Sequence, residues 1–384
     1  FIIEEDRIYR LKNILVNYNS QQITRSNLEK KMINEIINYI EFILTKVNPK
    51  LLYVAIDGVA PLAKMNQQRL RRYKSIFEKK QINDIKKELN ISLESNTWDT
   101  NAISPGTEFM DKLITHLNTC FKELKDKNKN IDIVFSSSYI NGEGEHTILD
   151  YIRTNEIHGN IIIYGLDADL IMLAMASHKN NVYLLRESIE FGKKIDNKLL
   201  YFDINLFKNR LITSLKEKLN EIDSGFYIND GDCFKMIDDY IFMCFLLGND
   251  FLPHNLAIDL RYDGHDILLD AYLNNYSINK GFLVDTQRMR INSRLLYSLL
   301  TILHTKEDKQ LIKIQKRRNR FRVNTNMCEN EFERRMMLIK NEPIIIEKKN
   351  TKIIENKTPS NKIFGLREKE NKVTKESNSK NTSK

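Results

Sequence analysis

Short apolar runs alternate with longer stretches in which apolar residues recur every three or four positions. Runs of four to six apolar residues are typical of buried strands, and the periodic stretches are typical of amphipathic helices. Strands are therefore predicted at 51–56, 131–135, 161–164, 181–185 and 199–204. Their alternation with helices predicts an α/β fold, with a central, mostly parallel sheet flanked by helices.

The helical pattern also has identifiable starts. Ser26 followed by Glu29 has the spacing of a capping box, which predicts a helix over 27–47. Further helices are predicted at 61–80, 107–124, 141–151, 205–221, 239–247, 267–272 and 292–303. From residue 341 onward the chain is rich in Lys, Asn, Glu, Ser and Thr without periodicity, so we expect a disordered tail.

Carboxylates follow several of the apolar runs. Five lie at or just after the ends of predicted strands, and a sixth follows a very apolar helix: Asp57, Glu143, Glu145, Asp167, Asp169 and Asp250. Ligands gather at the carboxyl ends of parallel strands, so we expect these acids to converge. So many charges need a compensating cation, and oxygen ligands suit Mg²⁺ or Mn²⁺.

Simpler roles for these acids stay open at this point. Asp167 and Asp169 could cap the helix that follows them. Glu143 and Glu145 could be placed at a helix N-terminus for its dipole, although the glycines between them favour a ligand loop. Asp250 could be an ordinary turn residue.

A stripe of polar residues lies on one side of the predicted helix at 61–80. Its members are spaced i, i+4, i+7 and i+8: Lys64, Gln68, Arg71 and Arg72. Three cations and an amide can grip a phosphate, but a solvated basic helix face explains the isolated pattern better. The same applies to the dense basic cluster at 312–322.

Composition changes this picture little. The 384 residues carry a net charge of +9, but the tail from 341 onward holds eleven Lys/Arg against six Glu, which leaves about +4 for the rest. Charge is thus weak evidence for a nucleic-acid partner. The chain has no apolar run of membrane-spanning length and no metal-type cysteine spacing, and we expect no signal peptide. We therefore expect an intracellular protein, located in the cytoplasm rather than the nucleus.

Five sequence blocks resemble the Xrn family of 5′→3′ exoribonucleases. They are AIDGVAPLAKMNQQRLRR (55–72), ISPGTEFM (103–110), GEGEHTILDYIR (142–153), YGLDADLIML (164–173) and FLLGNDFLPH (245–254). Five blocks in the right order over roughly 200 residues make the resemblance specific.

The resemblance implies a PIN-like/FEN-like nuclease fold with two divalent metal ions, Mg²⁺ or Mn²⁺. The six acids named above would be the metal ligands, and the Lys64–Arg72 stripe would be the pocket for the 5′-monophosphate. The substrate would be single-stranded RNA with a 5′-monophosphate, hydrolysed to nucleoside monophosphates in RNA decay. The nuclease domain would span 1–272, a helical extension 273–340 and the tail 341–384.

Two departures from the family pattern keep alternatives open. The family has a further N-terminal strand that ends in a catalytic Asp and is followed by a base-stacking His; because the chain starts at Phe1 rather than Met, we expect these upstream. The family's stacking Trp belongs to its second region, whereas Trp98 is the single Trp here. The alternatives are a catalytically impaired protein that binds RNA 5′ ends, and a flap-type DNA nuclease.

Overall fold

The computed structural model describes residues 24–92, 98–165, 167–190, 193–224, 228–249, 252, 255, 257–322 and 330–341. The chain divides into two units, Phe1–Lys340 and Asn341–Lys384. The elements described below lie in the first unit, except for the last residue of the last helix. The predicted disordered tail therefore lies outside the described residues, apart from Asn341, and the predicted domain boundaries stay predictions.

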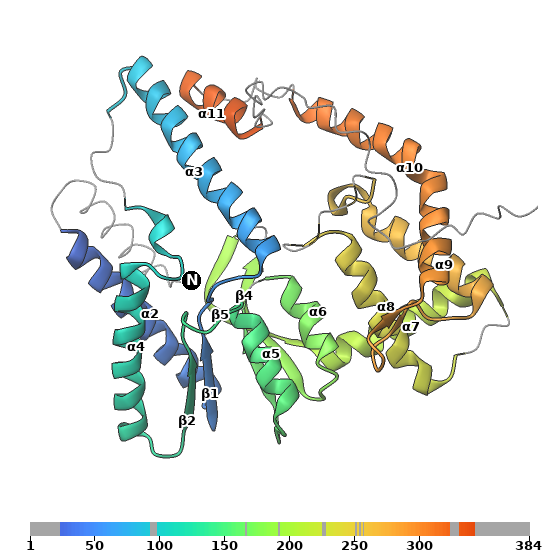
Figure 1. The fold of residues 1–384 in the computed structure, drawn as a ribbon, viewed down its shortest axis with the longest axis horizontal. Helices are drawn as coiled ribbons and strands as arrows, with labels where there is room; N and C mark the ends of the chain where they lie inside the picture. The colour runs from blue at the N-terminus through green and yellow to red at the C-terminus, as the bar shows by residue number, and fades with distance from the viewer. Residues whose placement is uncertain are drawn as a thin grey trace, which may run out of the picture. The chain divides into compact units, whose positions relative to one another are not determined.

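Helices outnumber strands in the described chain (Figure 1). The helices are α2 (Arg25–Val47), α3 (Leu62–Glu88), α4 (Glu108–Lys127), α5 (Gly144–Thr154), α6 (Asp169–Ala176), α7 (Ile204–Ile222), α8 (Asp230–Leu246), α9 (Gly264–Asn279), α10 (Ser293–Arg322) and α11 (Glu331–Asn341), with 3₁₀ turns η1 (Thr100–Ala102) and η2 (Leu260–Tyr262). The strands are β1 (Leu51–Ala55), β2 (Asp132–Ser136), β3 (Ile161–Tyr164), β4 (Val182–Glu190), β5 (Lys193–Asp203), β6 (Val284–Asp285) and β7 (Arg290–Ile291). The five predicted strands and the α/β class are confirmed.

The strands form small separate sheets. β1 pairs with β2 in parallel, with Leu51 opposite Asp132, and β3 pairs with β4 in parallel, with Ile161 opposite Val182. β4 and β5 form a long antiparallel hairpin, and β6 and β7 form a short one. The prediction of one central sheet is therefore wrong for the described residues, because alternation along the chain indicates which strands run parallel but not which edges meet. Among these residues, β1 and β3 each have a hydrogen-bonded neighbour on one side only.

Two clusters of buried apolar residues hold these elements together. The larger cluster joins β3 and β4 to helices α5 to α10, and its fully buried members include Met175, Leu184 and Tyr272. The smaller cluster lies between α2, α4 and the β1–β2 pair, and it includes Ile33 and Phe109. Each such buried side chain contributes roughly 1.5–3 kcal/mol of hydrophobic stabilisation.

The start of α2 differs from the prediction. Thr24, not Ser26, is the N-cap, and its hydroxyl accepts a hydrogen bond from the Asn27 N–H at 3.3 Å. Glu29 is only 3% exposed, and it pairs with Arg25 at 2.8 Å and Lys112 at 3.0 Å. The capping-box spacing was misleading because Glu29 turns inward to these cations.

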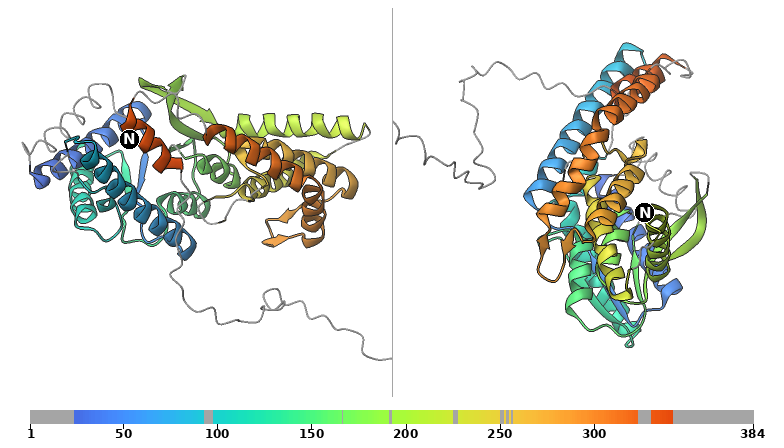
Figure 2. Two further views of the ribbon diagram at one scale, coloured as in Figure 1. Left: turned by 90° about the horizontal axis from the view of Figure 1, so that it is seen from above. Right: turned by 90° about the vertical axis from the view of Figure 1, so that its right-hand side faces the viewer.

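Several helices extend beyond their predicted ends. α3 continues to Glu88 as one uninterrupted helix, and none of its residues is buried (Figures 1 and 2). α8 begins at Asp230, nine residues before its predicted start, because Asn229 caps it by accepting a hydrogen bond from the Asp232 N–H at 2.8 Å. α9 and α10 are also longer than predicted, and α11 was not predicted at all. Within the described part of the chain, every helix is too short or too polar to cross a membrane.

Candidate metal and phosphate site

The loops that follow β1 and β2 are joined by backbone hydrogen bonds. Gly58 N–H donates to Gly142 C=O at 2.8 Å, and Gly142 N–H donates to Val59 C=O at 2.9 Å. Gly142 has φ +107°, a backbone conformation that residues other than glycine rarely adopt. A Cβ on Gly58 would lie 1.7 Å from the carbonyl oxygen of Ile140. Glycine is therefore required where the two loops cross.

This junction connects Asp57 to the start of α5. Asp57 Oδ1 accepts a hydrogen bond from the Gly144 N–H at 2.7 Å. Glu143 occupies the N-cap position of α5, but its own side chain makes no capping hydrogen bond. Asp57 thus satisfies a backbone donor of the helix end, and the Glu143 carboxylate stays available for other partners.

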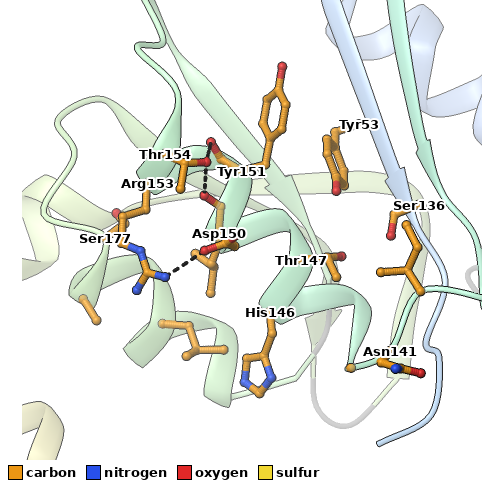
Figure 3. Close-up of a pocket in the computed structure, with 15 residues that line it drawn as sticks. Tyr53, Ser136, Asn141, His146, Thr147, Asp150, Tyr151, Arg153, Thr154 and Ser177 are labelled. Atoms are coloured by element: carbon orange, nitrogen blue, oxygen red, sulfur yellow. Dashed lines mark hydrogen bonds and ion pairs between the residues drawn. The ribbon is translucent and has the colours of Figure 1, made fainter.

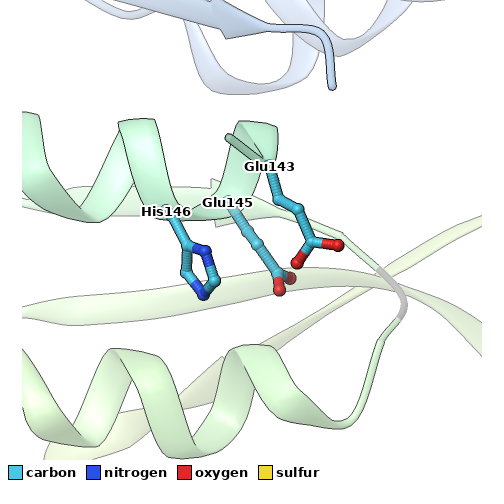
Figure 4. Close-up of side chains that lie close together, drawn as sticks. All are labelled: Glu143, Glu145 and His146. Atoms are coloured by element: carbon cyan, nitrogen blue, oxygen red, sulfur yellow. The ribbon is translucent and has the colours of Figure 1, made fainter. Parts of the chain in front are cut away.

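Three potential metal ligands project from the first turn of α5 (Figure 4). They are Glu143, Glu145 and His146, and one ligand atom from each lies within 4.8 Å of the others. Glu143 is 4% exposed, and the other two are partly buried. His146 was missed as a site residue in the sequence. The available signal was its position three residues after Glu143, since residues so spaced share one side of a helix.

The acids that follow β3 lie close enough to affect α5. Burial, and then the negative charges of Glu143, Asp169 and Asp167, raise the pKa of Glu145 to about 7, while Lys64 lowers it. Ala168 is the N-cap residue of α6, and this position provides no side-chain capping hydrogen bond. Neither Asp167 nor Asp169 therefore occupies the N-cap position that the capping alternative assigned to them. Five of the six predicted acids gather around the first turn of α5, and Asp250 lies outside the described residues.

The predicted phosphate stripe begins beside these acids. Lys64 lies in the first turn of α3, and its Nζ is 2.8 Å from Glu143 Oε1. The two side chains are only 13% and 6% exposed. α3 is helical throughout, so Gln68, Arg71 and Arg72 follow on the same side; Gln68 is partly buried and the two Arg are exposed. The structure therefore joins the cationic stripe to the acidic cluster through one ion pair.

A cavity of about 710 Å³ borders α5 (Figure 3). Its lining includes Tyr53 from β1, His146 from the first turn of α5 and Ser177 at the end of α6. Asp150 and Arg153 form an ion pair at 2.8 Å along its wall. His146 thus belongs both to the acidic cluster and to this cavity, which no sequence pattern had predicted.

The donor set of the cluster fits a divalent cation. Carboxylate oxygens dominate it, and hard cations such as Mg²⁺ and Mn²⁺ prefer oxygen ligands. The Lys64 ammonium, paired with Glu143, already provides one positive charge next to this cluster. Among the described residues, Glu143, Glu145 and His146 form the one group of His, Cys, Asp and Glu side chains close enough to hold a metal ion.

Comparisons with known proteins match both halves of the chain. The family model described as the XRN 5′-3′ exonuclease N-terminus matches residues 8–188, and the model described as the Xrn1 helical domain matches residues 231–384. The first match contains the five gathered acids and the stripe on α3.

Individual relatives agree with these models. A 5′-3′ exoribonuclease 2 of Kluyveromyces lactis is 34% identical over 369 residues, which cover 82% of this chain and 37% of that protein. A 5′-3′ exoribonuclease 2 of Candida glabrata is 37% identical over 283 residues, covering 64% of this chain and 28% of the relative. A 5′-3′ exoribonuclease 1 of Schizosaccharomyces pombe is 35% identical over 296 residues, which cover 71% of this chain and 22% of that protein. The chain thus spans little more than a third of these relatives at most, and by its sequence it belongs to the Xrn family of 5′→3′ exonucleases.

Proposed function

We propose that this chain carries the nuclease site of a divalent-metal-dependent 5′→3′ exoribonuclease. Its substrate is RNA with a 5′-monophosphate, and its products are nucleoside monophosphates. The observation that carries this proposal is the 2.8 Å contact between Lys64 and Glu143. This contact brings a cationic stripe suited to a terminal phosphate next to acids suited to metal-assisted hydrolysis, as an exonuclease requires.

The proposed fold is of the PIN-like/FEN-like nuclease type. Parallel pairing of β1 with β2 and of β3 with β4 supports it. The positions of Asp57 after β1 and of Asp167 after β3 also support it, because the strand ends then present acids to a common site.

Each group of side chains has a proposed task. Asp57, Glu143, Glu145, Asp167, Asp169 and Asp250 would hold two divalent ions, Mg²⁺ or Mn²⁺. When bound, such ions supply an activated water and stabilise negative charge on the reacting phosphate. Lys64, Arg71 and Arg72 bind the terminal phosphate, with the Gln68 amide as a further donor. Arginine matches phosphate oxygens with paired hydrogen bonds, which fixes the orientation of the 5′ nucleotide.

The first experiment tests the acids. Asp169→Asn should lose metal-dependent release of nucleotides from 5′-phosphorylated RNA, and it should still bind that RNA. Asp150→Asn is the control, because Asp150 lies on α5 but pairs with Arg153. Metal-dependent hydrolysis retained by Asp169→Asn would refute the assignment. A wild-type chain that binds the RNA but releases no nucleotide with Mg²⁺ or Mn²⁺ would instead support an RNA-end-binding protein.

The second experiment tests the stripe. Arg71→Ala should weaken binding of 5′-phosphorylated RNA by roughly 10- to 100-fold, the usual effect of losing a hydrogen bond between charged groups. Binding of the same RNA with a 5′-hydroxyl should change little. Arg69→Ala is the control, since Arg69 is exposed on α3 outside the stripe. An unchanged preference for the 5′-phosphate would rule out the pocket.

A further inference from the structure

We propose that Lys64 couples cation binding at Glu143 to recognition of the 5′-phosphate. In the pairing seen here, the Lys64 ammonium is held by the Glu143 carboxylate. Lys64 is released to the phosphate when that carboxylate takes up a divalent cation. This inference rests on the proposed function, and it adds that the two halves of the site are loaded together.

The ion pair is largely shielded from solvent. Both side chains are largely withdrawn from solvent, so neither charge can be left without a partner at little cost. The Glu143 carboxylate makes no helix-capping hydrogen bond. One of its oxygens lies within 4.8 Å of a potential metal-ligand atom of Glu145 and of His146. An ammonium group and a divalent cation at the same carboxylate repel each other. Cation binding therefore weakens the hold of Glu143 on Lys64.

The released ammonium has a second partner within reach. Lys64 shares its side of α3 with Gln68, Arg71 and Arg72, which follow it by four, seven and eight residues. The Lys64 ammonium thus contacts the acids and also belongs to the stripe on α3. A phosphate that engages Lys64 before the cation is present would leave Glu143 buried and uncompensated, which makes phosphate binding weak at that stage.

Thermodynamic linkage makes this coupling reciprocal. If a cation strengthens phosphate binding by some factor, a bound phosphate strengthens cation binding by the same factor. The consequence for the enzyme is that an RNA 5′ end is held firmly only when Glu143 has taken up a cation. RNA ends would then not occupy an unloaded site unproductively.

The test uses the full chain, Mn²⁺ and adenosine 5′-monophosphate, which contains no bond for an exonuclease to cut. Mn²⁺ affinity is measured by the electron paramagnetic resonance signal of free Mn²⁺, with and without the nucleotide. For wild type, the nucleotide should raise Mn²⁺ affinity by at least about fivefold, the lower end of typical coupling. Adenosine, which lacks the phosphate, should have no effect.

Lys64→Met should bind Mn²⁺ at least as tightly as wild type, and its Mn²⁺ affinity should change less than about twofold with the nucleotide. Lys74→Met is the matched control, because Lys74 is half exposed on the same helix and pairs with Glu78; it should behave as wild type. Glu143→Gln provides an independent variant, in which the ion pair between Lys64 and residue 143 is removed and nucleotide binding should no longer depend on Mn²⁺. Weaker Mn²⁺ binding by Lys64→Met, or a nucleotide effect as large as in wild type, would overturn the coupling.

Failure of the coupling can be told apart from failure of the proposed function. A wild-type chain that prefers the nucleotide to adenosine equally with and without Mn²⁺ would keep the phosphate site and refute the coupling. A chain that shows no preference for the nucleotide even with saturating Mn²⁺ would refute the phosphate site itself.

Discussion

Neutralising Glu145 should stabilise the protein in the absence of metal. Burial and the charges of Glu143, Asp169 and Asp167 raise the pKa of this carboxyl from 4.5 to about 7. The folded protein therefore binds this proton more tightly than the unfolded chain does. Consequently, the free energy of unfolding falls as pH rises from about 4.5 to about 7, and it stays reduced at higher pH. Glu145→Gln removes this loss.

The size of the effect follows from the pKa. At about 1.4 kcal/mol for each tenfold change in proton affinity, a rise from 4.5 to about 7 corresponds to about 3 kcal/mol. Glu145 is only partly buried, and solvent screening reduces this to about 1–2 kcal/mol. Glu145→Gln should therefore be more stable than wild type by this amount at about pH 8 in EDTA. At about pH 4.5 the difference should disappear, because the wild-type carboxyl is then protonated.

Urea unfolding followed by tryptophan fluorescence measures this difference. Trp98 is the single tryptophan, and it packs edge-on against Phe109 with ring centroids 5.2 Å apart. Adding Mg²⁺ should reduce the advantage of Glu145→Gln, because a cation offsets the repulsion in wild type. Glu156→Gln is the control, since the Glu156 side chain is 87% exposed. Equal stability of Glu145→Gln and wild type at about pH 8, or the same gain at about pH 4.5, would refute the electrostatic argument.

Two further predictions concern the stability of the fold, one at the loops beside the site and one at the buried ion pairs of α2. Gly58→Ala should lower the free energy of unfolding by about 2–4 kcal/mol and weaken Mn²⁺ binding, because the new Cβ would meet the backbone of Ile140 at 1.7 Å. Gly231→Ala, whose Cβ would meet Asn229 Oδ1 at 3.3 Å, is its control; equal unfolding curves for the two variants would argue against the crossing loops as a constraint. Glu29→Ala should cost about 1–3 kcal/mol near neutral pH in urea unfolding. Burial acts to raise the pKa of Glu29, but hydrogen bonds from Arg25, Lys112 and Trp98 outweigh it and hold the pKa below its usual value. The Glu29 contribution is thus present above about pH 4.5 and lost as pH falls through the lowered pKa, so a cost that persists in acid would contradict the ion-pair explanation.

The elements that carry the candidate site could be predicted from the sequence. An apolar run followed by a carboxylate identified β1 with Asp57 and β3 with Asp167, because a strand needs apolar side chains and its end can present a polar one. The i, i+4, i+7, i+8 spacing identified one side of α3 from the helical period alone. These predictions succeeded because they depend on the spacing of residues within one strand or helix, and they do not depend on contacts with distant parts of the chain.

The contacts between elements could not be read in the same way. Lys64 and Glu143 are far apart in the chain, and no local pattern indicates that they touch. Asp239 resembled the first residue of a helix, yet it is fully buried within α8 and accepts hydrogen bonds from Tyr272 and the backbone of Leu283 and Val284. Such positions are decided by tertiary packing, which overrides the local signal.

The one-sided pairing of β1 and β3 bears on how the protein behaves in concentrated solution. Among the described strands, each has backbone N–H and C=O groups along one edge that no neighbouring strand uses. Strand edges of this kind are templates on which another polypeptide can add a strand, and natural proteins commonly guard them with charges, prolines or bulges. β1 reads LLYVA and β3 reads IIIY, so neither strand contains a charge or a proline to discourage such pairing. These edges can therefore accept a further strand, either from another part of the full-length protein or from a second molecule, and light scattering across a dilution series distinguishes the two, because only pairing with a second molecule increases with concentration.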